Sequence, residues 1–327
     1  MPTFAPTTSA AADESPGLSI VVPVYNSEKT LIDLAARLEP VLRATGREFE
    51  LILINDGSRD GSWPVVRQLV DRHPWVRGID LMRNYGQHNA LLCGLRAARY
   101  STTITMDDDL QNPPEEIPAM LAKLDEGVVD VVYGTPAKQQ HGLLRGVASS
   151  VTKLTLQNAM GADTARKISA FRAFRTRLRS AFADYRSPYV NLDVLLTWST
   201  SRFTAIEVRH DPRAAGVSNY SLVKLLVHAL NMMTGFSTWP LRLASLLGFA
   251  FTVFGMGVLV YVIGRYLISG TPVQGFPFLA SIIAIFSGAQ LFALGVIGEY
   301  LARIHLRGME RPTYAVRGLA VSEGAKT

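Results

Sequence analysis

Three consecutive carboxylates stand where an apolar segment of the chain ends. Asp107, Asp108 and Asp109 follow the run 101–106, and Gln111 comes two residues later. Side chains alternate faces along an extended segment, so Asp107, Asp109 and Gln111 are predicted to share one face, with Asp108 on the other. Hard divalent cations take oxygen ligands and are often held by one or two carboxylates together with substrate phosphates. The pattern therefore predicts a Mg²⁺ or Mn²⁺ site for a phosphorylated substrate, with Asp107, Asp109 and Gln111 as metal ligands.

The same run has a purely structural explanation as the start of a helix. Asn112 precedes two prolines and two glutamates, a composition typical of helix N-termini. A cap needs one such residue, whereas the chain offers four, so the metal site is the favoured interpretation.

Strand-like and helix-like patterns alternate along the segment that must position these acids. Such alternation predicts an α/β fold with a mostly parallel sheet covered by helices. Ligands of these sheets bind beyond the carboxyl ends of the strands, where Asn26, Asn55 with Asp56 and the acid run all fall. No GxGxxG motif follows the first strand, which argues against a dinucleotide-dependent dehydrogenase. The predicted strands cover 18–24, 49–54, 76–81, 102–106 and 128–133, with helices near 28–43, 63–71, 88–99 and 114–125.

Two apolar runs near the C-terminus, 243–264 and 276–298, contain no Lys, Arg, Asp or Glu. Each is long enough to span a bilayer, which predicts a transmembrane hairpin with spans at about 243–266 and 276–298. The connecting loop carries one charge, Arg265, whereas arginines flank the outer ends of the pair. The excess of positive charge at those ends predicts that both chain termini are cytoplasmic. The flanking arginines are Arg242, Arg303, Arg307, Arg311 and Arg317.

The predicted organisation therefore has five parts. A disordered tail without an apolar signal core covers 1–17, and the cytoplasmic catalytic domain covers 18–218. An amphipathic juxtamembrane helix at 219–240 either lies in the membrane interface or packs on the sheet domain. The hairpin covers 241–300, and a cytoplasmic tail covers 301–327.

The chain is basic, with a formal net charge of +6 and a pI near 9.5. Its basic residues are scattered and show no DNA-binding signature, so anionic lipid headgroups are the favoured counterpart and nucleic acid is not. The single cysteine, Cys93, excludes an intramolecular disulfide.

Several motifs together resemble those of family 2 glycosyltransferases. They are VVPVYN at 21–26, NDGS at 55–58, DDDLQNPPEE from Asp107 and SAFRAFR at 169–175. NYGQHNALLCGL from Asn84 and GEYLARI from Gly298 favour the polyprenyl-phosphate glycosyltransferases, and among these the undecaprenyl-phosphate formamido-arabinose transferases over the dolichyl-phosphate mannose synthases. The resemblance covers roughly residues 18–315. It implies a GT-A catalytic domain and inverting transfer of a sugar from a nucleotide-diphosphate sugar, with UDP favoured over GDP, to a membrane polyprenyl phosphate.

The resemblance also implies roles for residues at the strand ends. Pro23, Tyr25 and Asn26 would form the nucleotide pocket, and Asp56 would contact the base or ribose. Asp107 and Asp108 would contact the nucleotide-sugar beside the metal.

Further residues are implied at the acceptor phosphate. Arg145 and Ser149 match a family pair four residues apart, and Arg213 and Ser218 match the family's R-x-x-G-x-S-K-Y loop. Arg172 matches the family's FRAYR segment. Each arginine has the alternative of being a solvated surface charge. The loop departs from the family at Asn219, where Lys is usual, which leaves the details of acceptor binding open.

The implied chemistry needs little acid–base help, because a phosphate monoester has a second pKa of about 6 and is largely ionised near neutral pH. Catalysis would then depend on alignment and on charge stabilisation by the metal and by Arg145, Arg172 and Arg213. If a general base exists, Asp108 or Asp163 is the candidate.

Three other functions share parts of the pattern. A processive polysaccharide synthase would carry Q-x-x-R-W and more spans, which are missing from the sequence. A non-catalytic membrane scaffold would not need the acid run, and a soluble nucleotidyltransferase would not need the hairpin. Small residues four apart, Ala244 with Gly248 and Ala284 with Gly288, together with the resemblance favour a homo-oligomer. The sugar, the polyprenyl length and the final glycan remain open.

Overall fold

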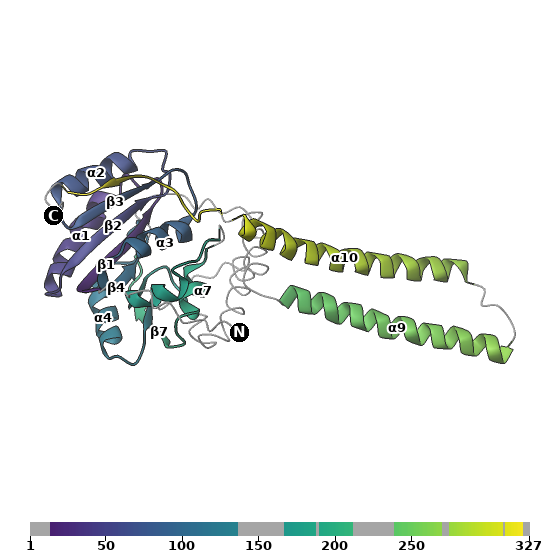
Figure 1. Cartoon of the computed structure of the whole chain (residues 1–327). Helices are drawn as coiled ribbons and strands as arrows, with labels where there is room; N and C mark the ends of the chain where they lie inside the picture. Colours follow the sequence, from purple (N-terminus) through teal and green to yellow (C-terminus); the bar gives the residue numbers. More distant parts are fainter. Residues whose placement is uncertain are drawn as a thin grey trace, which may run out of the picture. The chain divides into compact units, whose positions relative to one another are not determined.

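A computed structural model of the chain describes residues 14–136, 167–187, 190–211, 239–269, 275–309 and 311–322. These residues belong to two compact units, shown along the chain in Figure 1. One unit comprises Met1–Leu222 together with Glu310–Thr327, and the other comprises Val223–Met309. The first contains the sheet, and the second contains two long helices.

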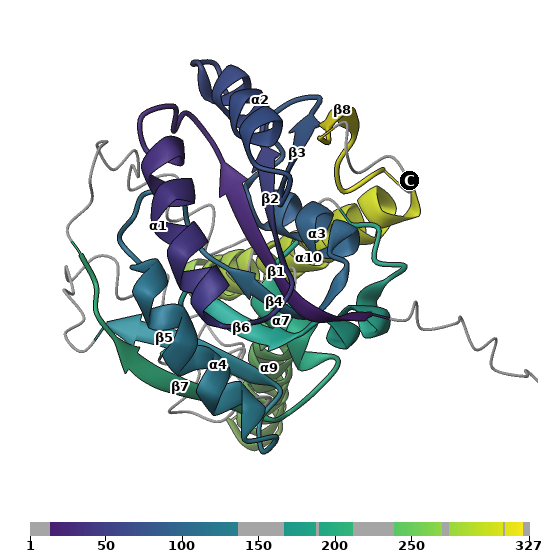
Figure 2. The same cartoon turned by 90° about the vertical axis from the view of Figure 1, so that its left-hand side faces the viewer.

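The described part of the first unit forms an eight-stranded sheet in the order β7-β5-β6-β4-β1-β2-β3-β8 (Figure 2). Neighbouring strands are parallel except where β6 lies between β4 and β5 and where β8 joins β3. The predicted α/β fold with a mostly parallel sheet is therefore confirmed. The strands are β1 Ser15–Val24, β2 Phe49–Asn55, β3 Val76–Leu81, β4 Tyr100–Thr105, β5 Val131–Pro136, β6 Arg172–Arg175, β7 Phe203–Val208 and β8 Val316–Ala320.

Helices cover the sheet because each presents an apolar stripe to it. In α1 the buried residues Leu31, Leu34, Leu38 and Leu42 recur every three or four positions, as one face of a helix requires. Helix α1 contacts α2 and η1, whereas α3 contacts α7 and η2, so two groups of helices pack around the strands. The helical segments of this unit are α1 Leu31–Ala44, α2 Ser62–Arg72, α3 Gln87–Ala97, η1 Pro114–Glu116, α4 Ile117–Asp125, η2 Thr176–Phe182 and α7 Leu192–Thr197.

The central strands are mostly apolar and buried because both of their faces are covered. All residues from Leu18 to Val24 of β1 are buried, as are those from Glu50 to Asn55 of β2. Continuous apolar runs of this kind are typical of parallel strands with helices on both sides. This packing holds the carboxyl ends of β1, β2 and β4 together at one edge.

The boundaries of the unit differ from the predicted domain organisation at both ends. Strand β1 begins at Ser15, inside the segment 1–17 that is predicted to be a disordered tail. Strand β8 lies inside the predicted tail 301–327, where it pairs antiparallel with the outer edge of β3. The predicted amphipathic helix 219–240 lies outside the described residues except for its last two positions, which begin α9.

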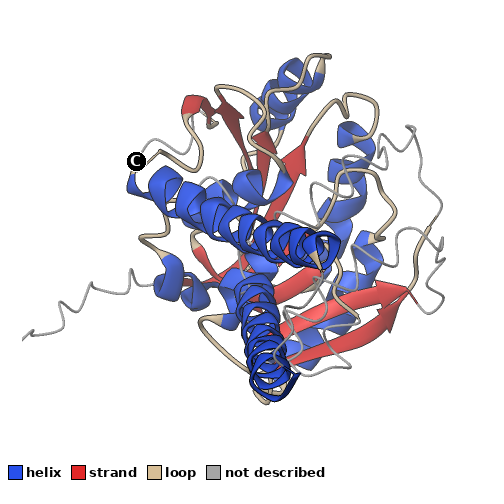
Figure 3. Cartoon of the chain, turned by 90° about the vertical axis from the view of Figure 1, so that its right-hand side faces the viewer, coloured by secondary structure: helices blue, strands red, loops and turns tan. Residues whose placement is uncertain are grey.

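The second unit contains α9, Trp239–Ser269, and α10, Phe276–Gly308, seen as the long blue helices of Figure 3. Both contain segments, Pro240–Ile268 and Ile285–Leu306, that are long and apolar enough to cross a membrane. Most of their described side chains are exposed, among them Phe249 at 68% and Ile268 at 87%. An apolar surface of this extent is typical of a protein embedded in lipid, which agrees with the predicted hairpin.

The two helices of the hairpin contact each other through aromatic rings. Phe251 and Phe286 meet edge to face with their ring centroids 5.6 Å apart, and Gly255 lies against Phe286. Among the described residues, a Cβ atom added at Gly248 would have no neighbour within 4 Å, so no close packing against the other helix requires a glycine there. The predicted homo-oligomer stays a prediction.

Candidate active site

A cavity of about 230 Å³ lies at the carboxyl ends of β1, β2 and β4, next to the first turn of α3. It brings together residues from four segments that are far apart in the sequence. Six of the predicted site residues line it: Pro23, Tyr25, Asp56, Asp107, Asp108 and Asp109. The remaining lining residues are Val24, Asn84, Gly86 and Gln87.

Asp56 organises the loop in front of α3. Its carboxylate accepts hydrogen bonds from the backbone N–H groups of Tyr85, at 2.7 Å, and Gly86, at 2.8 Å. Burial raises the pKa of Asp56, and these two N–H donors oppose the rise. The carboxylate thus fixes the loop while it borders the cavity.

The glycine that follows Asp56 is required by the close approach of this loop. Gly57 has a φ of +65°, and a Cβ atom there would lie 2.5 Å from the backbone nitrogen of Asn84. A side chain at this position would push the loop away and is also disfavoured by the left-handed backbone. Gly57 of the NDGS motif is therefore a structural requirement of the loop that borders the cavity.

The three aspartates diverge as they leave β4. Asp107 accepts a hydrogen bond at 2.6 Å from the side-chain amide of Gln87, the first residue of α3. Asp108 accepts one from the backbone N–H of Tyr25 at 3.3 Å, at the end of β1. Burial raises the pKa of Asp108 to about 6, against hydrogen bonds from Ser27 and Tyr25 that lower it. Neighbouring acids thus face different elements, as their alternation predicts.

The alternation does not continue to Gln111. Leu110 has a φ of +61°, a left-handed conformation in which the chain turns out of the extended path. The backbone N–H of Gln111 donates to the carboxylate of Asp109 at 3.2 Å, and the side chain of Gln111 is not among the cavity-lining groups. Alternation along an extended chain therefore does not place Gln111 beside Asp107 and Asp109. Its role as a metal ligand stays a prediction.

The structural alternative for the acid run, helix capping, finds no support in the described residues. The residue before η1 is Pro113, and neither η1 nor α4 has a side-chain capping hydrogen bond. The carboxylates instead line the cavity. In the described part of the chain, no three His, Cys, Asp or Glu side chains converge as a complete metal cage. Asp107 and Asp109 fit a cation that takes its remaining ligands from substrate phosphates and water.

Asn26 connects the end of β1 to the loop that follows β2. Its φ is +55°, its side-chain oxygen accepts the backbone N–H of Arg59 at 2.8 Å, and its own N–H donates to the hydroxyl of Ser58 at 3.0 Å. These bonds tie the end of β1 to the NDGS loop. Asn26 is exposed and is not among the residues that line the cavity, so its predicted contact with the nucleotide-sugar stays a prediction.

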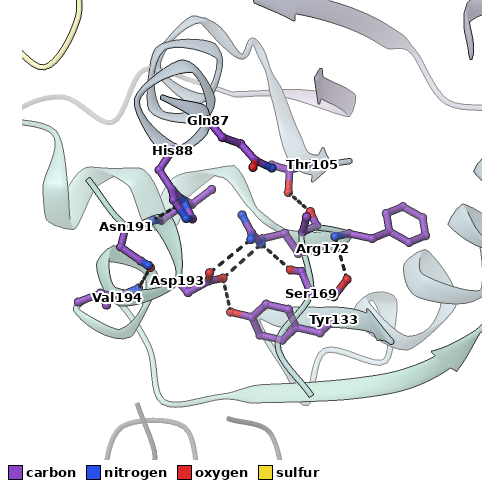
Figure 4. A network of polar contacts seen from close by, with 12 residues as sticks. Gln87, His88, Thr105, Tyr133, Ser169, Arg172, Asn191, Asp193 and Val194 are labelled. Atoms are coloured by element: carbon purple, nitrogen blue, oxygen red, sulfur yellow. Dashed lines mark hydrogen bonds and ion pairs between the residues drawn. The ribbon is translucent and has the colours of Figure 1, made fainter. Parts of the chain in front are cut away.

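Arg172 is buried in a polar network on the other side of β4. Its guanidinium pairs with Asp193, which also accepts a hydrogen bond from the hydroxyl of Tyr133 at 2.9 Å (Figure 4). The Arg172 side chain is only 3% exposed, so the alternative of a solvated surface charge is wrong for this arginine. Sequence reasoning missed Asp193 and Tyr133. The available signal was a carboxylate inside the apolar run LDVLL.

The predicted acceptor residues Arg145, Ser149, Arg213 and Ser218 lie outside the described residues, as does Asp163. Their roles stay predictions.

Comparison with known proteins decides the family. Residues 19–186 match the family model described as Glycosyl transferase family 2. The chain belongs to glycosyl transferase family 2. It is therefore a glycosyltransferase, and the resemblance seen in the sequence motifs is confirmed.

Curated relatives match this glycosyltransferase along almost its whole length. It is 36% identical over 314 residues, 94% of each chain, to the undecaprenyl-phosphate 4-deoxy-4-formamido-L-arabinose transferase of Shewanella sediminis. It is 34% identical to the enzyme of that name from Salmonella paratyphi B, again over 94% of each chain. The identity to the Pectobacterium atrosepticum enzyme is 33%, over 93% of this chain and 94% of the relative. The match includes the hairpin as well as the sheet domain.

Among solved structures, glucosyl-3-phosphoglycerate synthase from Mycobacterium tuberculosis, crystallised with uridine diphosphate, has a TM-score of 0.50. It covers 72% of this chain and 83% of its own at 17% identity. At this identity the similarity concerns the GT-A fold alone.

Proposed function

We propose that this family 2 glycosyltransferase moves a sugar from a nucleotide-diphosphate sugar, preferably a UDP-sugar, to the phosphate of a membrane polyprenyl carrier. The observation that carries the proposal is the cavity that gathers Asp56 with Asp107, Asp108 and Asp109 at the strand ends. Relatives that match over 94% of the chain are named as undecaprenyl-phosphate sugar transferases, which supports a lipid phosphate acceptor of the undecaprenyl or decaprenyl type.

The nucleotide would lie along the ends of β1 and β2. Pro23 and Tyr25 form one wall of the cavity, and Asp56 with the loop that it holds forms the other. Because the Asp56 carboxylate is fixed by two backbone N–H groups, it can accept ribose or base donors without reorganising. These residues would orient the donor so that its diphosphate faces Asp107 and Asp109.

The diphosphate would be bound together with Mg²⁺ or Mn²⁺. Asp107 and Asp109 would hold the cation, with Gln111 as a further proposed ligand. When bound, the cation supplies positive charge that stabilises the departing diphosphate. Gln87 holds the Asp107 carboxylate at 2.6 Å and so limits its movement.

The acceptor phosphate attacks the anomeric carbon from the face opposite the diphosphate, which inverts the configuration. Its oxygen is already ionised near neutral pH, since the second pKa of a phosphate monoester is about 6, and it needs no proton removed. Arg145, Ser149, Arg213 and Ser218 are the proposed acceptor residues, and Asp108 contacts the nucleotide-sugar. The product is a polyprenyl-phosphate-linked sugar for modification of a cell-envelope glycan.

The hairpin suits this acceptor, because a polyprenyl chain stays in the bilayer and only its phosphate reaches the surface. We place the protein in the inner or plasma membrane with two spans. The arginines that flank the outer ends of the spans favour a cytoplasmic catalytic domain and cytoplasmic termini. Nucleotide-sugars would then be met at the same face as the lipid phosphate.

The test is transfer of label in detergent. Purified protein is incubated with polyprenyl phosphate, a divalent cation and a panel of radiolabelled UDP- and GDP-sugars, and label in organic-extractable lipid is measured. One donor should give metal-dependent labelling that Asp109→Ala abolishes. Asp71→Asn, which removes an exposed carboxylate on α2, is the control and should retain activity. Absence of labelled lipid with every donor, from folded protein that binds nucleotide, would contradict the proposal and favour a non-catalytic scaffold.

A further inference from the structure

Strand β8 contains a bulge at Arg317. Gly318 pairs with Asp80, whereas Val316 pairs with Leu81, so the register shifts by one and Arg317 is the extra residue. Figure 2 shows β8 beside β3 at the edge of the sheet. A bulge re-aims the side chain of the strand that carries it, and bulges are frequent at sheet edges and next to active sites. The contacts of Arg317 therefore show what the bulge achieves.

Arg317 binds two groups at the carboxyl end of β3. Its Nη2 donates to the backbone carbonyl of Met82 at 2.7 Å, and its Nη1 lies 3.5 Å from the carboxylate of Asp80. The backbone N–H of Met82 donates to the carbonyl of Ala315 at 2.9 Å, so both backbone groups of this residue bind the C-terminal segment. The Arg317 side chain is 57% exposed, whereas that of Asp80 is buried. Arg317 thus fixes the first residue after β3 and gives a buried carboxylate its cation.

Asp80 connects Arg317 to the NDGS loop. Its carboxylate accepts a hydrogen bond from the side-chain amide of Asn55 at 2.7 Å, and both residues are buried. The side-chain oxygen of Asn55 accepts the backbone N–H of Ser58 at 3.3 Å. Asn55 immediately precedes Asp56, which borders the cavity. One path of contacts therefore runs from Arg317 to the loop that carries Asp56.

A second path runs along the chain from Met82. The loop 82–86 borders the same cavity through Asn84 and Gly86. Arg317 holds the start of this loop at Met82, and Asp56 holds its end by accepting the backbone N–H groups of Tyr85 and Gly86. Both paths from Arg317 thus meet at Asp56, on the side of the cavity where the nucleotide is proposed to lie.

We infer that Arg317 is a positioning residue for the donor nucleotide, which couples the pairing of β8 with β3 to occupancy of the nucleotide pocket. This inference rests on the proposed function. Coupling of this kind is reciprocal: if Arg317 favours nucleotide binding, the bound nucleotide favours the β8 contacts by the same factor. A segment that follows the second long helix in the chain would then take part in donor binding. The alternative is that β8 only covers the edge of β3, in which case Arg317 contributes to stability alone.

The other edge of the sheet offers a matched control. Arg202 stands immediately before β7, its side chain is 51% exposed, and it pairs at 2.9 Å with the largely buried Asp130. Neither residue is among those that line the cavity. Arg202 and Arg317 therefore form similar pairs at opposite edges of the sheet, and only the contacts of Arg317 lead to the cavity. A purely structural role would make the two arginines behave alike.

The experiment compares Arg317→Gln and Arg317→Lys with Arg202→Gln in the full-length protein. For each, the Kd for UDP, the KM for the donor, kcat and the melting temperature are measured. Arg317→Gln should raise the Kd and the donor KM about fivefold, at the lower end of typical couplings between sites, and leave kcat at saturating donor unchanged. Arg317→Lys should have an intermediate effect, because a single ammonium group replaces the two-pronged guanidinium. Arg202→Gln should keep the UDP affinity of the wild type.

Hydrogen exchange tests the coupling directly and does not depend on transfer. Without nucleotide, the N–H groups of Tyr85 and Gly86 should exchange faster in Arg317→Gln than in the wild type or in Arg202→Gln. Saturating UDP should slow exchange at 315–320 in the wild type, and this slowing should be lost in Arg317→Gln.

The inference is overturned if Arg317→Gln, like Arg202→Gln, lowers only the melting temperature and keeps both the UDP affinity per folded molecule and the exchange at 82–86. If the wild type binds no UDP, the proposed donor fails separately. Exchange at Tyr85 and Gly86 then decides the inference, since unchanged rates in Arg317→Gln would show that Arg317 does not hold this loop.

Discussion

Carboxylates at the two ends of the sheet are held by different kinds of partner. At the amino ends of the strands, Glu50 accepts from Arg77 at 2.7 Å, and Asp130 accepts from two nitrogens of Arg202, each at 2.9 Å. At the carboxyl ends, Asp56 accepts from two backbone N–H groups, and Asp107 accepts from an amide. Among these hydrogen bonds, arginine donates to the first set, whereas backbone N–H groups and a side-chain amide donate to the second set.

The pKa values follow the same division. The guanidinium of Arg202 holds the pKa of Asp130 below its usual range, while burial raises the pKa of Asp56 and brings that of Asp108 to about 6. Acids that stabilise a fold are paired within it, and acids poised for a ligand keep their charge at some cost to the fold. The difference predicts that Asp130 is a structural carboxylate and that Asp56 and Asp108 serve a ligand.

The largest effect is expected from Asp109→Asn, which removes charge at the cavity and leaves the volume of the side chain nearly unchanged. Transfer should fall about 1,000-fold, in the upper range found when one group that stabilises a transition state is lost. Steady-state kinetics at saturating metal would measure it. A melting temperature close to that of the wild type should accompany the loss, and a fall in both would place Asp109 with the structural acids.

Glu50→Gln should show the reverse behaviour. Removing one partner of a buried pair leaves the Arg77 guanidinium uncompensated and should destabilise the fold by about 3 kcal/mol. Urea denaturation followed by tryptophan fluorescence would measure the change. The kcat per folded molecule should be unchanged. A loss of kcat at denaturant concentrations where the protein is still folded would contradict the assignment of Glu50 as a purely structural carboxylate.

Asp56→Asn should weaken UDP binding about tenfold, the equivalent of one good polar contact. Its pH dependence has a definite sign. The folded pKa of Asp56 is raised, so its ionised form is disfavoured by folding, and this cost is present above the folded pKa and disappears below the unfolded value of about 4. The melting temperature of the variant minus that of the wild type should therefore increase as pH rises from 4 to 7. A decrease in this difference with rising pH would contradict the raised pKa of Asp56.

Asp130→Asn is expected to have the smallest effect, with the opposite sign. The folded pKa of Asp130 is lowered by Arg202, so ionised Asp130 stabilises the fold above its unfolded pKa of about 4, and that stability is lost as pH falls through the folded value. The wild type should melt above the variant at pH 7, and the two curves should converge towards pH 3. Arg202→Gln, which removes the same pair from the other side, should reproduce the convergence.

Much of the sheet, and the position of the acids at its carboxyl end, could be predicted from local sequence. The strands from β1 to β5 are short apolar runs between helical patterns, so their order, and the position of Asp56 and the acid run at the strand ends, followed from alternation alone. Asp107 and Asp108 faced different elements because the chain there is still extended. The predicted position of Gln111 beside Asp107 and Asp109 was not found. Leu110 adopts a left-handed conformation, which leucine rarely shows and which no turn motif in the sequence indicated.

Non-local pairings were beyond the reach of sequence patterns. Asp193 contacts Arg172, 21 residues away, and the sequence shows only that one carboxylate interrupts an apolar helix. Strand β8 is five residues long and contains an arginine and a glycine, so it resembles a polar tail. Its partner strand is distant, since Arg317 and Asp80 are separated by 237 residues.

Strand β8 also has a consequence for the order of events during synthesis. Its ladder with β3 is extended by Met82, whose N–H donates to Ala315 at 2.9 Å and whose carbonyl accepts from Arg317 at 2.7 Å. Translation proceeds at roughly 5–20 residues per second, and both long helices leave the ribosome before these residues do. The outer edge of β3 therefore stays open while the hairpin enters the bilayer, exposed to pairing with other chains. The catalytic sheet closes last, so a ribosome that stalls within the hairpin leaves a chain already anchored in the membrane with its sheet still open.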